Sequence, residues 1–191
     1  GFLQEVKLSP RAAISGTVVT SDGDEIEEAS ISVSASRLFR TYLESDAQAV
    51  LDALSYPATL SNGDGGFVVW VDPDVSTTAA IYDLELVPPA EAMAPRWTVD
   101  SVQIADSEST SSLGTIQLPP AAWARGVVRA GGEAVADAEV RIYQIDDNAS
   151  LCEQLALTAD TGCEPTARLR GIWRSDDDGW VAIVVPDVDV L

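Results

Sequence analysis

Residues 14–33 read ISGTVVTSDGDEIEEASISV, and residues 124–142 read ARGVVRAGGEAVADAEVRI. The two stretches share their apolar positions, and they also share a glycine if the second stretch is one residue shorter in its turn. The matched pairs are Gly16 with Gly126, Ile26 with Val135, Ala29 with Ala138, Ile31 with Val140 and Val33 with Ile142. A repeat of this length predicts two tandem copies of one folded unit.

A second block repeats further along the chain. ATLSNGDGGFVVWVDPD at 58–74 matches GIWRSDDDGWVAIVVPD at 171–187 without a gap. This alignment pairs Phe67 with Trp180, so Trp180 is expected in the core. Trp123 adjoins the prolines between the copies, where domains pack together. Core or junction positions are therefore expected for all five tryptophans, which are Trp70, Trp97, Trp123, Trp173 and Trp180.

The first copy reads as a series of short strands separated by turn residues. Apolar or alternating runs bounded by Gly, Asp and Pro are typical of strands and hairpins, and about seven of them at this spacing predict an antiparallel β-sandwich. The runs are 14–20, 29–35, 58–61, 67–71, 79–87, 96–104 and 113–118. A capping box at Ser45 and Gln48 with helical apolar spacing predicts one short inserted helix at 46–54, which ends before Pro57.

The second copy shows strands near 124–129, 138–145, 167–174 and 180–185. We expect an N-terminal extension at 1–13, a first sandwich at 14–118, a proline-stiffened linker at 119–123 and a second sandwich at 124–191. This second sandwich has no counterpart of the last three strands of the first. Two interpretations are open: the sequence is a fragment of a longer chain, or a neighbouring chain supplies the strands by strand exchange.

Composition narrows the class of protein. The hydrophobic fraction of 46% is enough for a packed core. The net charge of −20 disfavours nucleic acid and anionic membrane surfaces as partners. The sequence contains no apolar run of 18 or more residues, so no transmembrane segment is expected.

Cys152 and Cys163 are the two cysteines of the chain, and they lie in one predicted loop. Their spacing does not fit a CxxC metal or redox motif. It suits a local disulfide, which would contribute at most ~3 kcal/mol in the chain-entropy model. A disulfide would indicate an oxidising compartment outside the cytoplasm. The alternative is a pair of free, partly buried thiols.

The chain contains no histidine, which excludes a Ser-His-Asp triad, a Cys-His pair and a His-ligated zinc ion. Acidic clusters in two turns make calcium a candidate cofactor, because hard cations bind several oxygen ligands. The candidate ligands are Asp22, Asp24 and Glu25 in one turn and Asp176, Asp177 and Asp178 in the other. Ordinary turn chemistry explains the same residues, since Asp and Gly are favoured in tight turns.

The order of these motifs resembles the carboxypeptidase regulatory-like repeat, a transthyretin-like (prealbumin-like) β-sandwich. The "G-x-V" opening matches Gly16–Val18 and Gly126–Val128, and the "A-x-V-x-V" strand matches Ala29–Val33 and Ala138–Ile142. The "D-x-x-G-x-F" turn matches Asn62 to Phe67 loosely and Asp176 to Trp180 better. The resemblance implies a non-catalytic accessory module outside the cytoplasm.

The leading functional hypothesis is therefore an extracellular or cell-envelope module, lipid-anchored if the full-length protein carries an anchor. It would act as a spacer, an adhesive module or a protein-interaction domain. Its partners would be a protein or a polysaccharide at the cell surface. A carbohydrate-binding module is the alternative, motivated by the five tryptophans. A hydrolase using paired carboxylates comes third.

Overall fold

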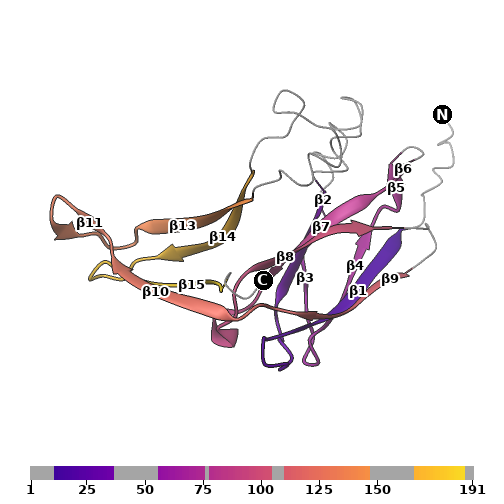
Figure 1. Cartoon of the computed structure of the whole chain (residues 1–191), viewed down its shortest axis with the longest axis horizontal. Helices are drawn as coiled ribbons and strands as arrows, with labels where there is room; N and C mark the ends of the chain where they lie inside the picture. The colour runs from indigo at the N-terminus through magenta and orange to yellow at the C-terminus, as the bar shows by residue number, and fades with distance from the viewer. Residues whose placement is uncertain (1–10, 37–55, 76–77, 105–109, 147–165, 188–191) are drawn as a thin grey trace, which may run out of the picture. The chain divides into compact units, whose positions relative to one another are not determined.

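The structure is a computed structural model that describes residues 11–36, 56–75, 78–104, 110–146 and 166–187. The chain divides into two compact units, each built of β-strands (Figure 1). The first unit comprises Gly1–Pro89 and Thr98–Gln117, and the second comprises Ala90–Trp97 and Leu118–Leu191. The domain boundaries expected from the sequence stay a prediction.

Three strands form the first sheet of the first unit. β1 (Ala12–Val19) lies in the middle, antiparallel to β4 (Gly66–Val71) on one edge and parallel to β9 (Thr110–Gln117) on the other. Buried positions alternate along β4, as expected for a strand with one face on a core.

The second sheet of this unit has the order β3-β2-β7-β8. Its strands are β3 (Thr59–Leu60), β2 (Ser30–Ala35), β7 (Ile81–Val87) and β8 (Trp97–Gln103). In β7, Tyr82, Leu84 and Leu86 are fully buried and alternate with less buried residues. Burial of each such side chain stabilises the fold by about 1.5–3 kcal/mol. The core of the first unit is therefore an apolar layer contributed by both sheets.

Smaller elements accompany this sandwich. β5 (Asp74–Val75) and β6 (Thr78–Ala79) form a short antiparallel pair. A single 3-10 turn, η1 (Ala90–Ala92), belongs to the second unit. Among the residues that the structure describes, no helix is long and apolar enough to cross a bilayer.

The second unit contains two long antiparallel pairs. β10 (Ala121–Val127) pairs with β15 (Trp180–Pro186), and β13 (Glu139–Asp146) pairs with β14 (Thr166–Arg174). A small hairpin of β11 (Arg129–Ala130) and β12 (Glu133–Ala134) follows β10. These are the four regions in which the sequence predicts strands.

The all-β sandwich predicted from the sequence is confirmed, and the seven expected strands of the first unit are present as β1, β2, β3, β4, β7, β8 and β9. One pairing differs from the antiparallel expectation. β9 is the last strand of this unit, and it pairs with β1 in the parallel direction. The predicted helix at 46–54 lies outside the described residues.

Candidate functional site

A buried serine organises the first unit. The Ser61 Oγ donates a hydrogen bond to the Ile26 carbonyl oxygen at 2.6 Å and accepts one from the Ala29 amide at 2.9 Å. The Ser61 amide also donates to the Ala29 carbonyl oxygen at 3.0 Å. One side chain thus satisfies both a donor and an acceptor of the segment that leads into β2. This arrangement, centred on Ser61, is the first serine corner.

The second unit contains the same arrangement around Ser175, the second serine corner. The Ser175 Oγ donates to the Val135 carbonyl oxygen at 2.6 Å and accepts from the Ala138 amide at 2.9 Å. The Ser175 amide donates to the Ala138 carbonyl oxygen at 3.1 Å. Both serines are buried. Neither serine was predicted from the sequence to have a structural role.

A tight turn follows each serine. The Asn62 Oδ1 accepts hydrogen bonds from the amides of Asp64 at 3.1 Å and Gly66 at 2.8 Å. The Asp176 Oδ1 accepts from the amides of Asp178 at 3.0 Å and Trp180 at 2.8 Å. In both turns a short polar side chain holds its own backbone, which is the usual role of Asn and Asp at such positions.

The two turns correct the ungapped alignment of 58–74 with 171–187. Equivalent hydrogen bonds pair Asn62 with Asp176 and Gly66 with Trp180, so the expected match of Phe67 with Trp180 is one residue out of register. A shift of one residue moves every side chain of a strand to the other face of the sheet. The residue equivalent to Phe67 is Val181, and both of these are buried.

This shift explains why the core position expected for Trp180 is wrong. Trp180 is 53% exposed and Trp70 is 56% exposed, so neither belongs to a core. Trp123 is likewise 53% exposed. Trp173 is partly buried, and so is Trp97. Trp97 is the first residue of β8 but falls in the second unit, where its ring lies 5.2 Å from the guanidinium carbon of Arg170.

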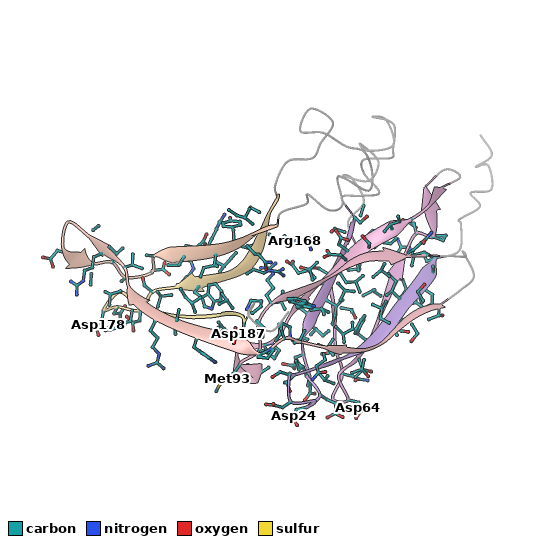
Figure 2. All side chains as sticks on the ribbon, viewed as in Figure 1. Asp24, Asp64, Met93, Arg168, Asp178 and Asp187 are labelled. Carbon is teal, nitrogen blue, oxygen red and sulfur yellow. The ribbon has the colours of Figure 1, made fainter. Side chains whose placement is uncertain are left out.

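The predicted calcium ligands lie in two exposed turns, of which Figure 2 labels Asp24 and Asp178. Asp22, Asp24 and Glu25 follow β1, and Asp176, Asp177 and Asp178 precede β15. The amides of Asp22 and Asp24 donate to the Thr20 Oγ1 at 3.3 and 3.1 Å, and these hydrogen bonds organise the first turn. Within the described ranges, no three His, Cys, Asp or Glu side chains are grouped so that they could hold a metal ion. Calcium binding stays a prediction from the sequence. Cys152 and Cys163 lie outside the described residues, and so does their predicted disulfide.

A tyrosine cluster in the first unit was not foreseen from the sequence. The hydroxyl of Tyr82 donates to the Asp72 carbonyl oxygen at 2.6 Å, and the hydroxyl of Tyr56 donates to the Asp72 Oδ2 at 3.0 Å. The two hydroxyl oxygens lie 3.0 Å apart, and the rings meet edge to face. Burial raises the pKa of both tyrosines, so both hydroxyls stay protonated as donors.

The tyrosine cluster also involves a weak ion pair. The Arg11 Nε lies 3.8 Å from the Asp72 Oδ1, and both side chains are partly exposed. An exposed pair of this kind contributes little to stability. The cluster therefore joins the ends of β4 and β7 through hydroxyl hydrogen bonds. Because the raised pKa keeps each tyrosine protonated, neither hydroxyl can act as a general base near neutral pH.

The two units differ in how deeply their equivalent apolar side chains are buried. Ile14, Val18 and Ile31 are fully buried in the first unit. Ala124 is exposed at the position equivalent to Ile14, and Val128 and Val140 are only partly buried. The described residues of the second unit thus leave its inner face incompletely covered.

Comparison with known proteins gives distant structural similarity only. No family model and no curated protein matches the chain. The shaft pilin SpaA of Lactobacillus rhamnosus GG is similar over 94% of this chain and 84% of its own, at 8% identity and a TM-score of 0.37. The full-length major pilin RrgB of Streptococcus pneumoniae is matched over 94% of this chain and 39% of its own, at 10% identity and a TM-score of 0.26. A Streptococcal ancillary pilin is matched over 92% of this chain and 50% of its own, at 11% identity and a TM-score of 0.33.

Proposed function

We propose that this chain is a non-catalytic structural module of the cell surface, which spaces or displays other protein domains and binds a protein partner. We further propose that its two units are tandem copies of a carboxypeptidase regulatory-like sandwich. The observation that carries the tandem-copy proposal is the serine corner, which occurs once in each unit with the same kinds of backbone donor and acceptor.

The polar groups of the units support a structural role. Within the described residues, the buried polar side chains are Ser36, Ser61, Arg170 and Ser175. Both corner serines use their hydroxyls to bind backbone groups, as buried polar groups in a framework do. The tyrosine cluster holds neutral donors rather than an activated base. The hydroxyls of Ser61 and Ser175 donate to backbone carbonyl oxygens and not to a side-chain base, which is the arrangement of a structural serine and not of a nucleophile.

A location outside the cytoplasm rests on composition. The net charge of −20 keeps such a surface soluble and disfavours nucleic acid. The predicted disulfide between Cys152 and Cys163 would need an oxidising compartment. Lipid anchoring of a longer protein stays an expectation.

Immunolabelling of intact cells of the source organism tests the surface assignment. Antibodies raised against the folded chain are expected to label unpermeabilised cells, and brief protease treatment of those cells should remove the label. An abundant cytoplasmic protein is the control for leakage. Labelling that requires permeabilisation would contradict the surface role.

A carbohydrate-binding role is the second candidate, because two exposed tryptophans share one face of a hairpin. Val127 lies opposite Trp180 and Trp123 lies opposite Val184 in the β10–β15 pair. Positions 123 and 127 lie on the same face of β10, so both indole rings are on that face. Flat exposed rings of this kind can stack on sugars.

A glycan array with the full chain tests this candidate. Binding should be lost in Trp123→Ala and Trp180→Ala, and it should be retained in Trp70→Ala, where an equally exposed tryptophan of the first unit is removed. An array without signal, or equal loss in all three variants, would reject a sugar site on β10–β15.

A further inference from the structure

Three large exposed side chains share the outer face of the β10–β15 pair. Trp123 and Arg125 are two positions apart on β10, and Trp180 of β15 lies opposite Val127, a further two positions along. Side chains two positions apart lie on the same face of a strand. Val181, the next residue of β15, is buried, so the face with Trp180 points away from the inner side of the second unit. We call Trp123, Arg125 and Trp180 together the outer aromatic face.

The strand pair itself does not require large side chains at these three positions. Val18 and Val128 make the same backbone hydrogen bond to the glycine before the paired strand, which makes β1 the equivalent of β10. In the first unit the equivalent residues are small: Ala13 for Trp123, Ser15 for Arg125 and Gly66 for Trp180. Because β1 and β4 form the same antiparallel pair with Ala, Ser and Gly, the larger side chains of the second unit point to a ligand.

Arg125 gives the outer aromatic face an unpaired positive charge. Within the described part of the chain, its side chain makes no ion pair and no hydrogen bond. It lies opposite Ala182, which is too small to cover the guanidinium group. β10 and β15 contain no Asp or Glu, although the chain has 31 acidic residues. Charges farther away than about 8 Å are largely screened at physiological salt, so an anion can bind here despite the net charge of −20.

The two indoles are placed for an extended ligand. Trp123 and Trp180 lie four positions apart along the strand pair, which is about 13 Å and more than one sugar ring can span. Arg125 lies midway between them. Each exposed indole offers a flat apolar surface, and its N–H group is a hydrogen-bond donor. The outer aromatic face therefore fits a chain of sugars that stacks on a ring at each end and carries negative charge in the middle.

We propose that the outer aromatic face binds an oligosaccharide of uronic acids. The carboxylate of a central sugar accepts two parallel hydrogen bonds from the Arg125 guanidinium, and the sugars on either side stack on Trp123 and Trp180. This proposal deepens the carbohydrate-binding candidate and rests on it. Trp and Arg are also prominent in protein interfaces. Two flat rings on either side of a cation favour the sugar, because a uronic acid combines apolar C–H faces with a carboxylate at its edge.

The test is a calorimetric titration of the full chain with two oligosaccharides of equal length. One is a β-linked oligoglucuronate, and the other is a cello-oligosaccharide, which has the same rings and linkage but a hydroxymethyl group in place of each carboxylate. We expect the oligoglucuronate to bind about tenfold more tightly or better, because only its carboxylates pair with Arg125. Equal affinity, tighter binding of the neutral oligosaccharide, or no binding of either would overturn the proposal.

Two variants that lose the same charge separate Arg125 from the overall charge of the chain. Arg125→Gln should remove the preference for the oligoglucuronate and leave binding of the cello-oligosaccharide nearly unchanged. Arg129→Gln, at an exposed position of β11 outside the β10–β15 pair, should keep the preference. Trp123→Ala should weaken binding of both ligands, because stacking does not depend on the carboxylate. A preference that survives in Arg125→Gln would overturn the proposal.

An acidic peptide is the other source of a carboxylate for this face. An oligoglutamate of similar length is expected not to bind, because it has no ring faces for the two indoles. Peptide binding as tight as that of the oligoglucuronate, and lost in both Trp123→Ala and Arg125→Gln, would overturn the assignment to a sugar. If only neutral glycans bound on the array and their binding needed Trp123 and Trp180, the carbohydrate-binding candidate would stand without this proposal. The surface role is tested separately by immunolabelling.

Discussion

The hydroxyl of Ser61 bonds the carbonyl oxygen of Ile26 at 2.6 Å across 35 positions of sequence. This bond ties the end of β3 to the loop that enters β2. Because both groups are buried from water, the hydrogen bond links distant parts of the first unit and constrains how its two sheets are joined.

Ser61→Ala should destabilise the first unit. It removes the acceptor of the Ala29 amide and the donor to Ile26, and unsatisfied buried groups cost about 1–3 kcal/mol. Urea unfolding of the full chain measures the loss. Ser34→Ala, at an exposed position in β2, is the control and should change stability by less than about 0.5 kcal/mol. Ser175→Ala should destabilise the second unit in the same way. If both variants shifted one and the same unfolding transition, the expectation that each serine stabilises only its own unit would be contradicted.

Gly65→Ala should cost more than Gly23→Ala. Both glycines have positive φ angles, +70° and +94°, which strain any L side chain. Only at Gly65 would the new Cβ also lie 2.5 Å from the Val18 carbonyl oxygen, whereas nothing lies within 4 Å at Gly23. We expect about 1 kcal/mol for Gly23→Ala and clearly more for Gly65→Ala. Thermal melts of the two variants provide the comparison. Equal losses of stability would mean that the backbone shifts to relieve the close approach of the new Cβ to the Val18 carbonyl oxygen.

Leu84→Ala and Leu60→Ala form a matched pair in the second sheet. Leu84 is fully buried, and its truncation should cost about 2–5 kcal/mol through lost transfer energy and a residual cavity. Leu60 is 59% exposed, and its truncation should cost less than about 0.5 kcal/mol. Chemical denaturation measures both. A large loss for Leu60→Ala would show that its side chain is covered in solution.

The tyrosine cluster predicts a loss of stability at alkaline pH. Burial raises the pKa of Tyr82 and Tyr56 above the value of 10.0 expected in the unfolded chain. Above pH 10 the unfolded chain therefore releases protons that the folded chain retains, so the free energy of unfolding falls as pH rises. Below pH 10 this contribution is fully present.

Unfolding curves between pH 8 and about pH 11.5 test this expectation. The native chain should lose stability over this range, and Tyr82→Phe should show a shallower decline because one of the linked protons is gone. Ultraviolet titration should show that these two tyrosines ionise only as the chain unfolds. Early ionisation of all four tyrosines, with no change in stability, would contradict the raised pKa values.

The strand content of the fold could be predicted because each strand carries a local signal. Alternating apolar residues between Gly- and Asp-rich turns mark β4 and β15 without knowledge of their partners. The repeated block also marks the turns at Asn62 and Asp176. Register is different, because it depends on which backbone groups bond across the sheet.

The outward position of Trp180 shows this limit. An ungapped match placed it on Phe67. The hydrogen bond from its amide to the Asp176 Oδ1 and its pairing with Val127 show that it corresponds to Gly66. The tyrosine cluster was hidden for a similar reason. Tyr56, Asp72 and Tyr82 come from three separate segments, and no local pattern brings them together.

The parallel pairing of β1 with β9 has a mechanical consequence. Ala13 lies beside Thr110 and Val19 beside Gln117, so the chain enters this sheet at one end and leaves it at the other. A pulling force applied through those two points runs along the strands. It loads the hydrogen bonds between β1 and β9 together, in shear, instead of peeling them apart one at a time. The first unit is thus connected in the way that best resists stretching.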